Sequence, residues 1–281
     1  MAKVYDALRK AEEERGRQAG MSPSIAGAPS TTDLVAGSRR AASAHKQPFW
    51  ERWLRAMRRR SEDPNAVNKR RIAQLMPGSF VAEQFRTLRA RLDSLAAQRP
   101  IRSLAITSAI QGEGKTTAAV NLALVNSMNL ERRVLLVDCD LRYPKVHAAL
   151  GLRPETGLAE VLVGDASVDK AVCRVEGTSL DVLPVRMKPP NPSELLASAR
   201  MRNLMEELVG RYDLVILDTP STLALPDAKT VSELTDGLVM VVRADATPQD
   251  DVEAALDVLD RRRVLGLVLN GARVDEGHYG Y

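Results

Sequence analysis

The residues best suited to chemistry lie in one short loop, Ser108–Thr117, which reads Ser-Ala-Ile-Gln-Gly-Glu-Gly-Lys-Thr-Thr. Gly112 and Gly114 carry no Cβ atom, so the backbone can turn tightly there and point its N–H groups at an anion. Lys115 supplies a mobile cation for the β- and γ-phosphates of a nucleotide, and the Thr116 hydroxyl is suited to Mg²⁺. These residue types, at this spacing, indicate a phosphate-binding loop.

The segments on either side of the loop support this interpretation. Residues 101–107 are short, apolar and partly β-branched, whereas residues 118–130 are rich in Ala, Leu and Val and contain no Gly or Pro. A strand, a glycine loop and a helix in this order are what phosphate binding requires, because the helix start adds free N–H groups. Ala109 replaces the first glycine of the motif, but a small residue still permits the turn. The alternative is a glycine-rich surface loop with an exposed lysine.

Carboxylates follow two further apolar runs. Residues 134–137 end in Asp138 and Asp140, and residues 214–217 end in Asp218. If both runs are parallel strands, these acids meet the loop at one edge of the sheet. Phosphoryl transfer needs carboxylate oxygens for Mg²⁺ and a group that orients or deprotonates the nucleophile. An aspartate at a strand end can instead cap the following helix.

The chain from residue 78 onward alternates between predicted strands and helices. Continuous apolar strands between helices predict an α/β fold with a mostly parallel sheet covered by helices on both faces. The predicted strands are 101–107, 133–138, 180–184, 213–218, 236–242 and 264–270. The predicted helices are 79–97, 115–129, 144–150, 157–163, 192–210, 226–234 and 248–261.

The composition of the 281 residues restricts the class of protein. Apolar residues make up 44%, and no apolar run approaches the ~20 residues that span a bilayer. No signal peptide is found, and Cys139 and Cys173 do not have the spacing of a metal site or a disulfide. Both observations predict a cytoplasmic protein. Residues 1–75 hold 16 Lys/Arg and 8 Asp/Glu, whereas residues 76–281 hold 24 and 28. The net negative charge of residues 76–281 argues against nucleic acid as a partner of the folded domain. The net positive charge of residues 1–75 favours an anionic surface near the N-terminal region.

The N-terminal region is predicted to be a largely disordered extension. Residues 1–15 favour a short helix that docks on a partner, although a frayed terminus is the alternative. Residues 16–77 are predicted to be a flexible basic linker. Within it, residues 49–60 place aromatic and apolar side chains on one helical stripe among arginines. Such a helix suits an anionic membrane or a partner groove, the alternative being a solvated charge run.

The ordered set of motifs resembles the bacterial tyrosine kinases of the capsular and exopolysaccharide family, the BY-kinases. The Walker A loop of that family corresponds to residues 109–116, its Walker A′ motif to Asp138–Arg142, and its Walker B motif to Asp218–Pro220. On the helix 79–97, a Glu-x-x-Arg-x-x-Arg pattern resembles the motif with which the family forms rings, here Glu83, Arg86 and Arg89. Residues 189–196 also look familial, and the whole resemblance covers about residues 78–281.

The resemblance implies roles for individual residues. It implies that ATP and Mg²⁺ are cofactors, with Lys115 stabilising the transferring phosphoryl group and Asp138 acting as the base. Metal ligands would be Thr116, Asp140 and Asp218. Acceptor tyrosines would be Tyr279 and Tyr281, in the tail 277–281, phosphorylated in a neighbouring subunit of the ring. Nucleotide-binding residues would be Gln111, Gly112, Glu113, Gly114, Lys115, Thr116, Thr117 and Asn270.

The resemblance also implies partners: further copies of the chain in a ring homo-oligomer, and a separate membrane adaptor that determines polysaccharide chain length. The protein would then be peripheral at the inner face of the cell membrane. Three departures stand out, namely Gln111 where the family carries Pro, Ser221 where it carries a second Pro, and a tail with only two tyrosines. The alternatives are a cell-division or partition ATPase of the MinD/ParA type and a nucleotide-binding scaffold of a polysaccharide machine. Ile110 argues against the partition type, which carries a lysine at that position.

Overall fold

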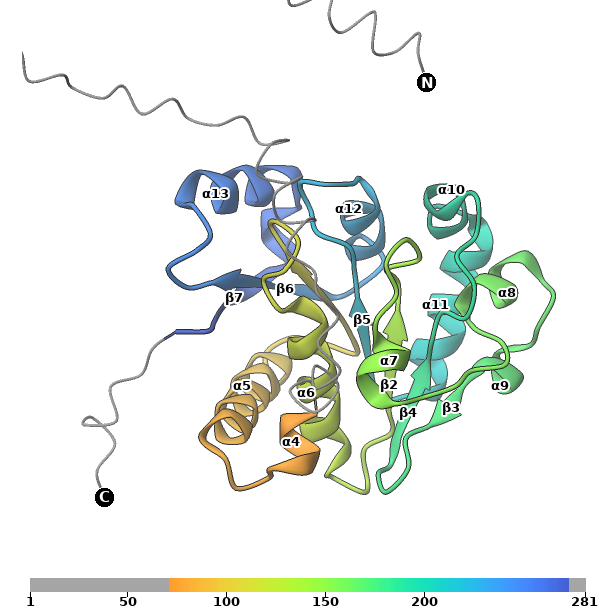
Figure 1. Ribbon diagram of the computed structural model, residues 1–281, viewed down its shortest axis with the longest axis horizontal. Helices are drawn as coiled ribbons and strands as arrows, with labels where there is room; N and C mark the ends of the chain where they lie inside the picture. The colour runs from red at the N-terminus through yellow and green to blue at the C-terminus, as the bar shows by residue number, and fades with distance from the viewer. Residues whose placement is uncertain (1–70, 273–281) are drawn as a thin grey trace, which may run out of the picture. The chain divides into compact units, whose positions relative to one another are not determined.

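The computed structural model of the chain describes residues 71–272. Its centre is a seven-stranded sheet with the strand order β3-β4-β2-β5-β1-β6-β7 and helices on both faces (Figure 1). Every neighbouring pair is parallel except β3 with β4. The predicted fold class is therefore confirmed. The strands are β1 Ser103–Ser108, β2 Val134–Asp138, β3 Cys173–Arg174, β4 Leu180–Leu183, β5 Leu214–Asp218, β6 Gly237–Arg243 and β7 Val264–Asn270.

Most predicted helices are present with slightly shorter bounds. The α-helices are α4 Ile72–Leu75, α5 Phe80–Ala96, α6 Lys115–Ser127, α7 Val146–Leu150, α8 Leu158–Val163, α9 Val168–Ala171, α10 Pro192–Leu196, α11 Ala199–Arg211, α12 Asp227–Ser232 and α13 Gln249–Val258. A 3₁₀ turn, η1 Arg261–Arg263, precedes β7. Among these helices, none is both long enough and apolar enough to cross a bilayer.

The single helix predicted over 192–210 is wrong, because the structure contains two helices there. The backbone of Ser198 is extended, with φ −70° and ψ 159°, and its hydroxyl accepts a hydrogen bond from the Met201 N–H at 3.1 Å. Ser198 is therefore the N-cap of α11, and α10 ends just before it. A serine in the middle of an otherwise helical pattern was the available signal.

The linker predicted to reach residue 77 ends earlier. Arg71 donates from Nε to the Ala149 carbonyl at 3.1 Å, and Gln74 donates from Nε2 to the Glu176 carbonyl at 3.2 Å. These contacts hold α4 against the folded domain. The predicted helix 1–15, the segment 49–60 and the tail 277–281 lie outside the described residues.

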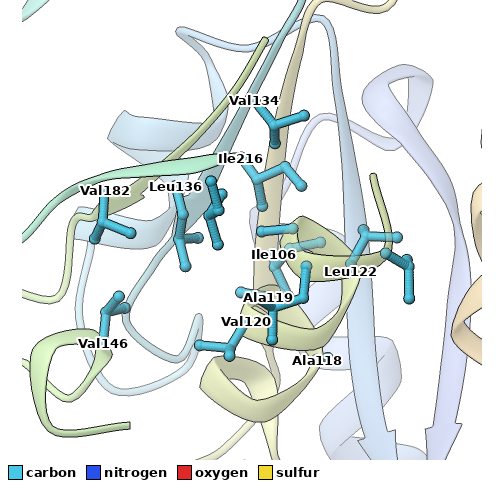
Figure 2. Close-up of a cluster of buried hydrophobic side chains, with 14 of the residues drawn as sticks. Ile106, Ala118, Ala119, Val120, Leu122, Val134, Leu136, Val146, Val182 and Ile216 are labelled. Atoms are coloured by element: carbon cyan, nitrogen blue, oxygen red, sulfur yellow. The ribbon is translucent and has the colours of Figure 1, made fainter. Parts of the chain in front are cut away.

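Alternation along the strands divides the apolar side chains between the two faces of the sheet, with one core on the first face and two on the second. In β1, Leu104 and Ile106 pack toward α6, whereas Ala105 packs toward α13 on the opposite face. Figure 2 shows the first core, where Ile106 and Ile216 from neighbouring strands lie in one cluster with Leu122 of α6. Helix α6 is apolar around nearly its whole circumference and is buried accordingly. The second face is covered by α8, α9, α10, α11 and α12 beside β2, β4 and β5.

This topology places the candidate site at the carboxyl edge of the sheet. Strand β1 lies between β5 and β6, and β2 lies beside β5. The register pairs Asp138 of β2 directly with Asp218 of β5, and Ile106 of β1 with the same Asp218. The ends of the three central strands therefore meet where the phosphate-binding loop leaves β1.

Candidate active site

The backbone of the phosphate-binding loop requires its two glycines. Gly112 has φ 91° and Gly114 has φ 100°, a left-handed region that side chains with a Cβ atom rarely adopt. Gly114 is the N-cap of α6, so Lys115 is the first residue of that helix. The free N–H groups of the first turn and the helix dipole thus face the loop. This arrangement is the one predicted from the sequence.

Glu113 fixes the loop from within. Its side chain is buried at 1% exposure; Oε2 accepts from the Ile110 N–H at 2.7 Å, and Oε1 accepts from the Thr247 hydroxyl. Burial raises the pKa of Glu113, although these hydrogen bonds oppose the shift. Asn270 donates from Nδ2 to the Glu113 carbonyl at 2.7 Å. The side chains of Glu113 and Asn270 therefore hold the loop in shape, and Thr247 is a contributor that sequence reasoning missed.

Replacement of Gly114 by alanine is expected to weaken nucleotide binding by at least about tenfold. A Cβ atom at this position would lie 2.1 Å from Asn270 Nδ2, and the backbone φ would be strained in addition. Titration with a fluorescent ADP analogue measures the effect. The matched control is Gly210→Ala in α11, where nothing lies within 4 Å of the added Cβ atom. Unchanged affinity in Gly114→Ala would contradict the role given to this turn.

Lys115 lies among the carboxylates that the sequence places at this edge. Its Nζ is 2.9 Å from Asp140 Oδ2 and 3.8 Å from Asp218 Oδ1. Burial by itself lowers the pKa of Lys115, but attraction by Asp218 and Asp140 outweighs it, and the pKa is raised. The lysine therefore stays protonated at neutral pH and supplies a positive charge beside these acids.

Asp138 has two sets of contacts. Its Oδ2 accepts from the N–H groups of Lys145 and Val146 at 3.1 and 3.0 Å, which caps the start of α7, and its Oδ1 accepts from the Asp140 N–H at 3.2 Å. Burial, followed by repulsion from Asp218, raises the pKa of Asp138 well above its usual range. Asp138 therefore caps a helix, which is the alternative role considered from the sequence. A raised pKa also suits a residue that accepts a proton.

The donor set at this edge fits Mg²⁺. Asp140 and Asp218 are buried, and Thr116 follows Lys115 in the first turn of α6. Magnesium takes one or two carboxylates together with substrate phosphates, so two acids and a hydroxyl match its chemistry. Within residues 71–272, no group of three or more His, Cys, Asp or Glu residues is arranged to hold a metal ion.

Arg142, the last residue of the segment Asp138–Arg142, forms hydrogen bonds with two residues outside this motif. Its Nε donates to Asp227 Oδ2 at 3.0 Å, and its Nη2 donates to Ser193 Oγ at 2.8 Å. Ser193 donates in turn to Asp227 Oδ1 at 2.5 Å. The three side chains join the loop after β2 to α10 and α12. Sequence reasoning noted residues 189–196 as familial, but it did not find Asp227, for which the sequence carried no signal.

The predicted oligomerisation residues share a flank of α5. Arg86 donates to the exposed Glu83 within the helix. Arg89 donates from Nη1 to the Val125 carbonyl at 2.7 Å, near the end of α6. Arg89 thus contributes to packing within the subunit. Tyr279 and Tyr281 lie outside the described residues.

Comparison with known proteins places these features in a family. A family model described as an AAA domain matches residues 101–259. The tyrosine-protein kinase YwqD of Bacillus subtilis is 39% identical over 213 residues, covering 75% of this chain and 90% of that protein. The kinase domain of the Escherichia coli tyrosine kinase ETK is 32% identical with a TM-score of 0.67, over 75% of this chain and 84% of that one. The chimerical protein CapA2B2 is 32% identical with a TM-score of 0.69, over 73% and 91%.

Proposed function

Because the chain belongs to the bacterial tyrosine-protein kinases built on a phosphate-binding loop, we propose that it transfers the γ-phosphoryl group of ATP to protein tyrosines. One observation carries the proposal. Lys115 lies between Asp140 and Asp218, beside Asp138, where the loop leaves the sheet. Phosphoryl transfer needs this combination of a cation, metal-binding carboxylates and a base around a triphosphate.

In this proposal the loop from Gln111 to Thr117 cradles the phosphates of ATP with its N–H groups. Lys115 turns from Asp140 to the β- and γ-phosphates and stabilises their charge. Thr116, Asp140 and Asp218 would hold Mg²⁺, which would supply positive charge to neutralise the phosphates. The side chains of Glu113 and Asn270 keep the loop in position from behind.

The acceptor step then uses Asp138. The tyrosine oxygen forms a bond to the γ-phosphorus as the bond from that phosphorus to the β-bridging oxygen breaks, and ADP leaves. A tyrosine hydroxyl has an ordinary pKa of about 10, so it needs a base at neutral pH. Asp138 accepts this proton.

The acceptors are Tyr279 and Tyr281 of a neighbouring copy in a ring held by Glu83, Arg86 and Arg89. Phosphates added to the tail bring repulsive charge toward bound nucleotide and loosen the ring. We further propose that residues 78–281, together with α4 packed against them, form the kinase domain. The residues before α4, and especially 49–60, would connect it to a membrane adaptor or to anionic lipid at the inner face of the cell membrane. The process served would be capsule or exopolysaccharide synthesis.

Mass spectrometry of the C-terminal peptide tests the proposal directly. After incubation of the full-length protein with Mg·ATP, phosphate is expected on Tyr279 and Tyr281, and none is expected after incubation with Mg·ADP. The variant Tyr279→Phe/Tyr281→Phe should lose nearly all phosphotyrosine while it still binds nucleotide. Nucleotide binding without any phosphotyrosine in the wild type would instead favour a switch ATPase or a scaffold.

A further inference from the structure

A short exposed platform lies beside the candidate active site, in the loop that follows β4. Three consecutive side chains, Arg186, Met187 and Lys188, are exposed there; the Arg186 side chain is 46% exposed and Met187 is 56% exposed. We call these three residues the Arg186–Lys188 platform. It presents two cations around one apolar side chain at the same edge of the sheet as Asp138 and Asp140, because β4 is parallel to β2 and adjacent to it.

The base of the platform is held rigidly. Pro184 accepts a hydrogen bond at its carbonyl from the Leu158 N–H at 2.8 Å. The backbone passes so close to Gly157 that a Cβ atom there would lie 2.3 Å from the Pro184 carbonyl oxygen. Arg186 is oriented by Glu160, whose carboxylate lies 3.8 Å from its guanidinium. A loop that is already ordered loses little conformational entropy when it binds a partner.

Lys188 connects the platform to the catalytic loop. Its Nζ lies 5.4 Å from the centre of the Tyr143 ring, within the range of a cation–π contact. Tyr143 in turn donates its backbone N–H to Asp140 Oδ1 at 3.0 Å. A peptide that pairs with Lys188 is thereby held next to the loop that carries the metal-binding acid.

We propose that the Arg186–Lys188 platform binds the acidic pair Asp275–Glu276 in the C-terminal segment 273–281 of a second copy of the chain. The inference rests on the proposed function, and it names how the acceptor segment is recognised. The charges are complementary, because the segment carries two adjacent acids three residues before Tyr279. Cations at the platform would offset the repulsion that an acidic peptide meets from Asp138, Asp140 and Asp218.

The position of β7 favours a second copy over the same chain. The described chain leaves the sheet after β7, which lies five strand positions from β4, or about 24 Å at ~4.8 Å per strand. The chain from Asn270 to Glu276, six residue steps, spans at most about 20–22 Å when fully extended. A tail in its own subunit would therefore fall short of β4 even when fully extended. A tail from another copy approaches without that restriction.

Peptide binding by charge reversal tests the platform. A fluorescein-labelled peptide of residues 273–281 is titrated with full-length protein saturated with Mg·ADP, so that no phosphate is transferred. Arg186→Glu/Lys188→Glu is expected to bind this peptide about tenfold more weakly than the wild type. A peptide with Asp275→Lys/Glu276→Lys should also bind the wild type about tenfold more weakly. The reversed protein with the reversed peptide should recover most of the affinity.

The matched control is Arg261→Glu/Arg262→Glu in η1, two exposed arginines at the opposite, amino edge of the sheet, which should change peptide affinity less than twofold. The ADP affinity of each sample shows that the variant is folded. Equal affinities in all combinations, or no recovery in the doubly reversed pair, would overturn the platform. If peptide affinity depends on the charges as described but the protein never phosphorylates its tail, the platform is supported and the proposed kinase reaction is contradicted.

Discussion

Replacement of Lys115 by methionine is expected to lower the rate of tail phosphorylation by about 1,000-fold, the scale on which a single transition-state charge contact acts. Methionine keeps the length of the side chain but removes the cation 2.9 Å from Asp140 and 3.8 Å from Asp218. The transferring phosphoryl group then loses the positive charge that the loop supplies. The measurement is phosphotyrosine formed per minute by the purified variant, quantified by mass spectrometry.

The control for this variant is Lys170→Met, which removes an exposed lysine on the short helix α9. Its rate should equal that of the wild type. The Lys115 variant should also lose thermal stability without nucleotide, because two buried acids are left without the cation that neutralised them. Phosphotyrosine at the wild-type rate in purified Lys115→Met protein would refute the assignment of the active site.

Replacement of Asp138 by asparagine is expected to lower the phosphorylation rate by at least about 100-fold while Mg·ADP still binds. The amide cannot accept the proton of the tyrosine hydroxyl. Stability should change little, because the asparagine oxygen can still accept from the N–H groups of Lys145 and Val146 and the change removes a carboxyl group that burial and Asp218 disfavour as an anion. The experiment compares rates under saturating Mg·ATP with thermal unfolding of the same samples.

This experiment distinguishes a role of Asp138 as the catalytic base from a role as a helix cap alone. A base predicts that the rate falls far more than the small fraction of unfolded protein can explain. A cap alone predicts a rate per folded molecule close to that of the wild type, because asparagine caps a helix about as well as aspartate. The second result would remove Asp138 from the mechanism and leave Lys115 in place. Ser198→Ala, which removes the N-cap of α11, shows how the loss of a helix cap by itself affects the rate.

Much of this fold could be predicted from local sequence. The apolar runs that became β2 and β5 carry no turn residues and have bounds within a residue or two of those predicted. Their final aspartates could be placed at one edge because parallel strands end together. The need for glycine at positions 112 and 114 could also be predicted, since the left-handed backbone there favours glycine.

The remaining features depend on contacts between residues that are distant in the sequence. Thr247 reaches Glu113 from the segment between β6 and α13, and Asp227 reaches Arg142 from α12. Neither residue belongs to a recognisable motif, so only the folded chain brings them to the site. The short elements β3 and α4 were missed for the same reason, because tertiary contacts and not local propensity form them.

The bond from Arg89 to the Val125 carbonyl has a mechanical consequence. Helix α6 is a buried rod about 20 Å long at ~1.5 Å per residue, with Lys115 at one end and this arginine anchored near the other. A neighbouring subunit that engages Arg89 in the proposed ring would act on the same rod that presents the lysine to ATP. If ring assembly changes the affinity for nucleotide by some factor, thermodynamic linkage requires bound nucleotide to change the affinity of assembly by the same factor.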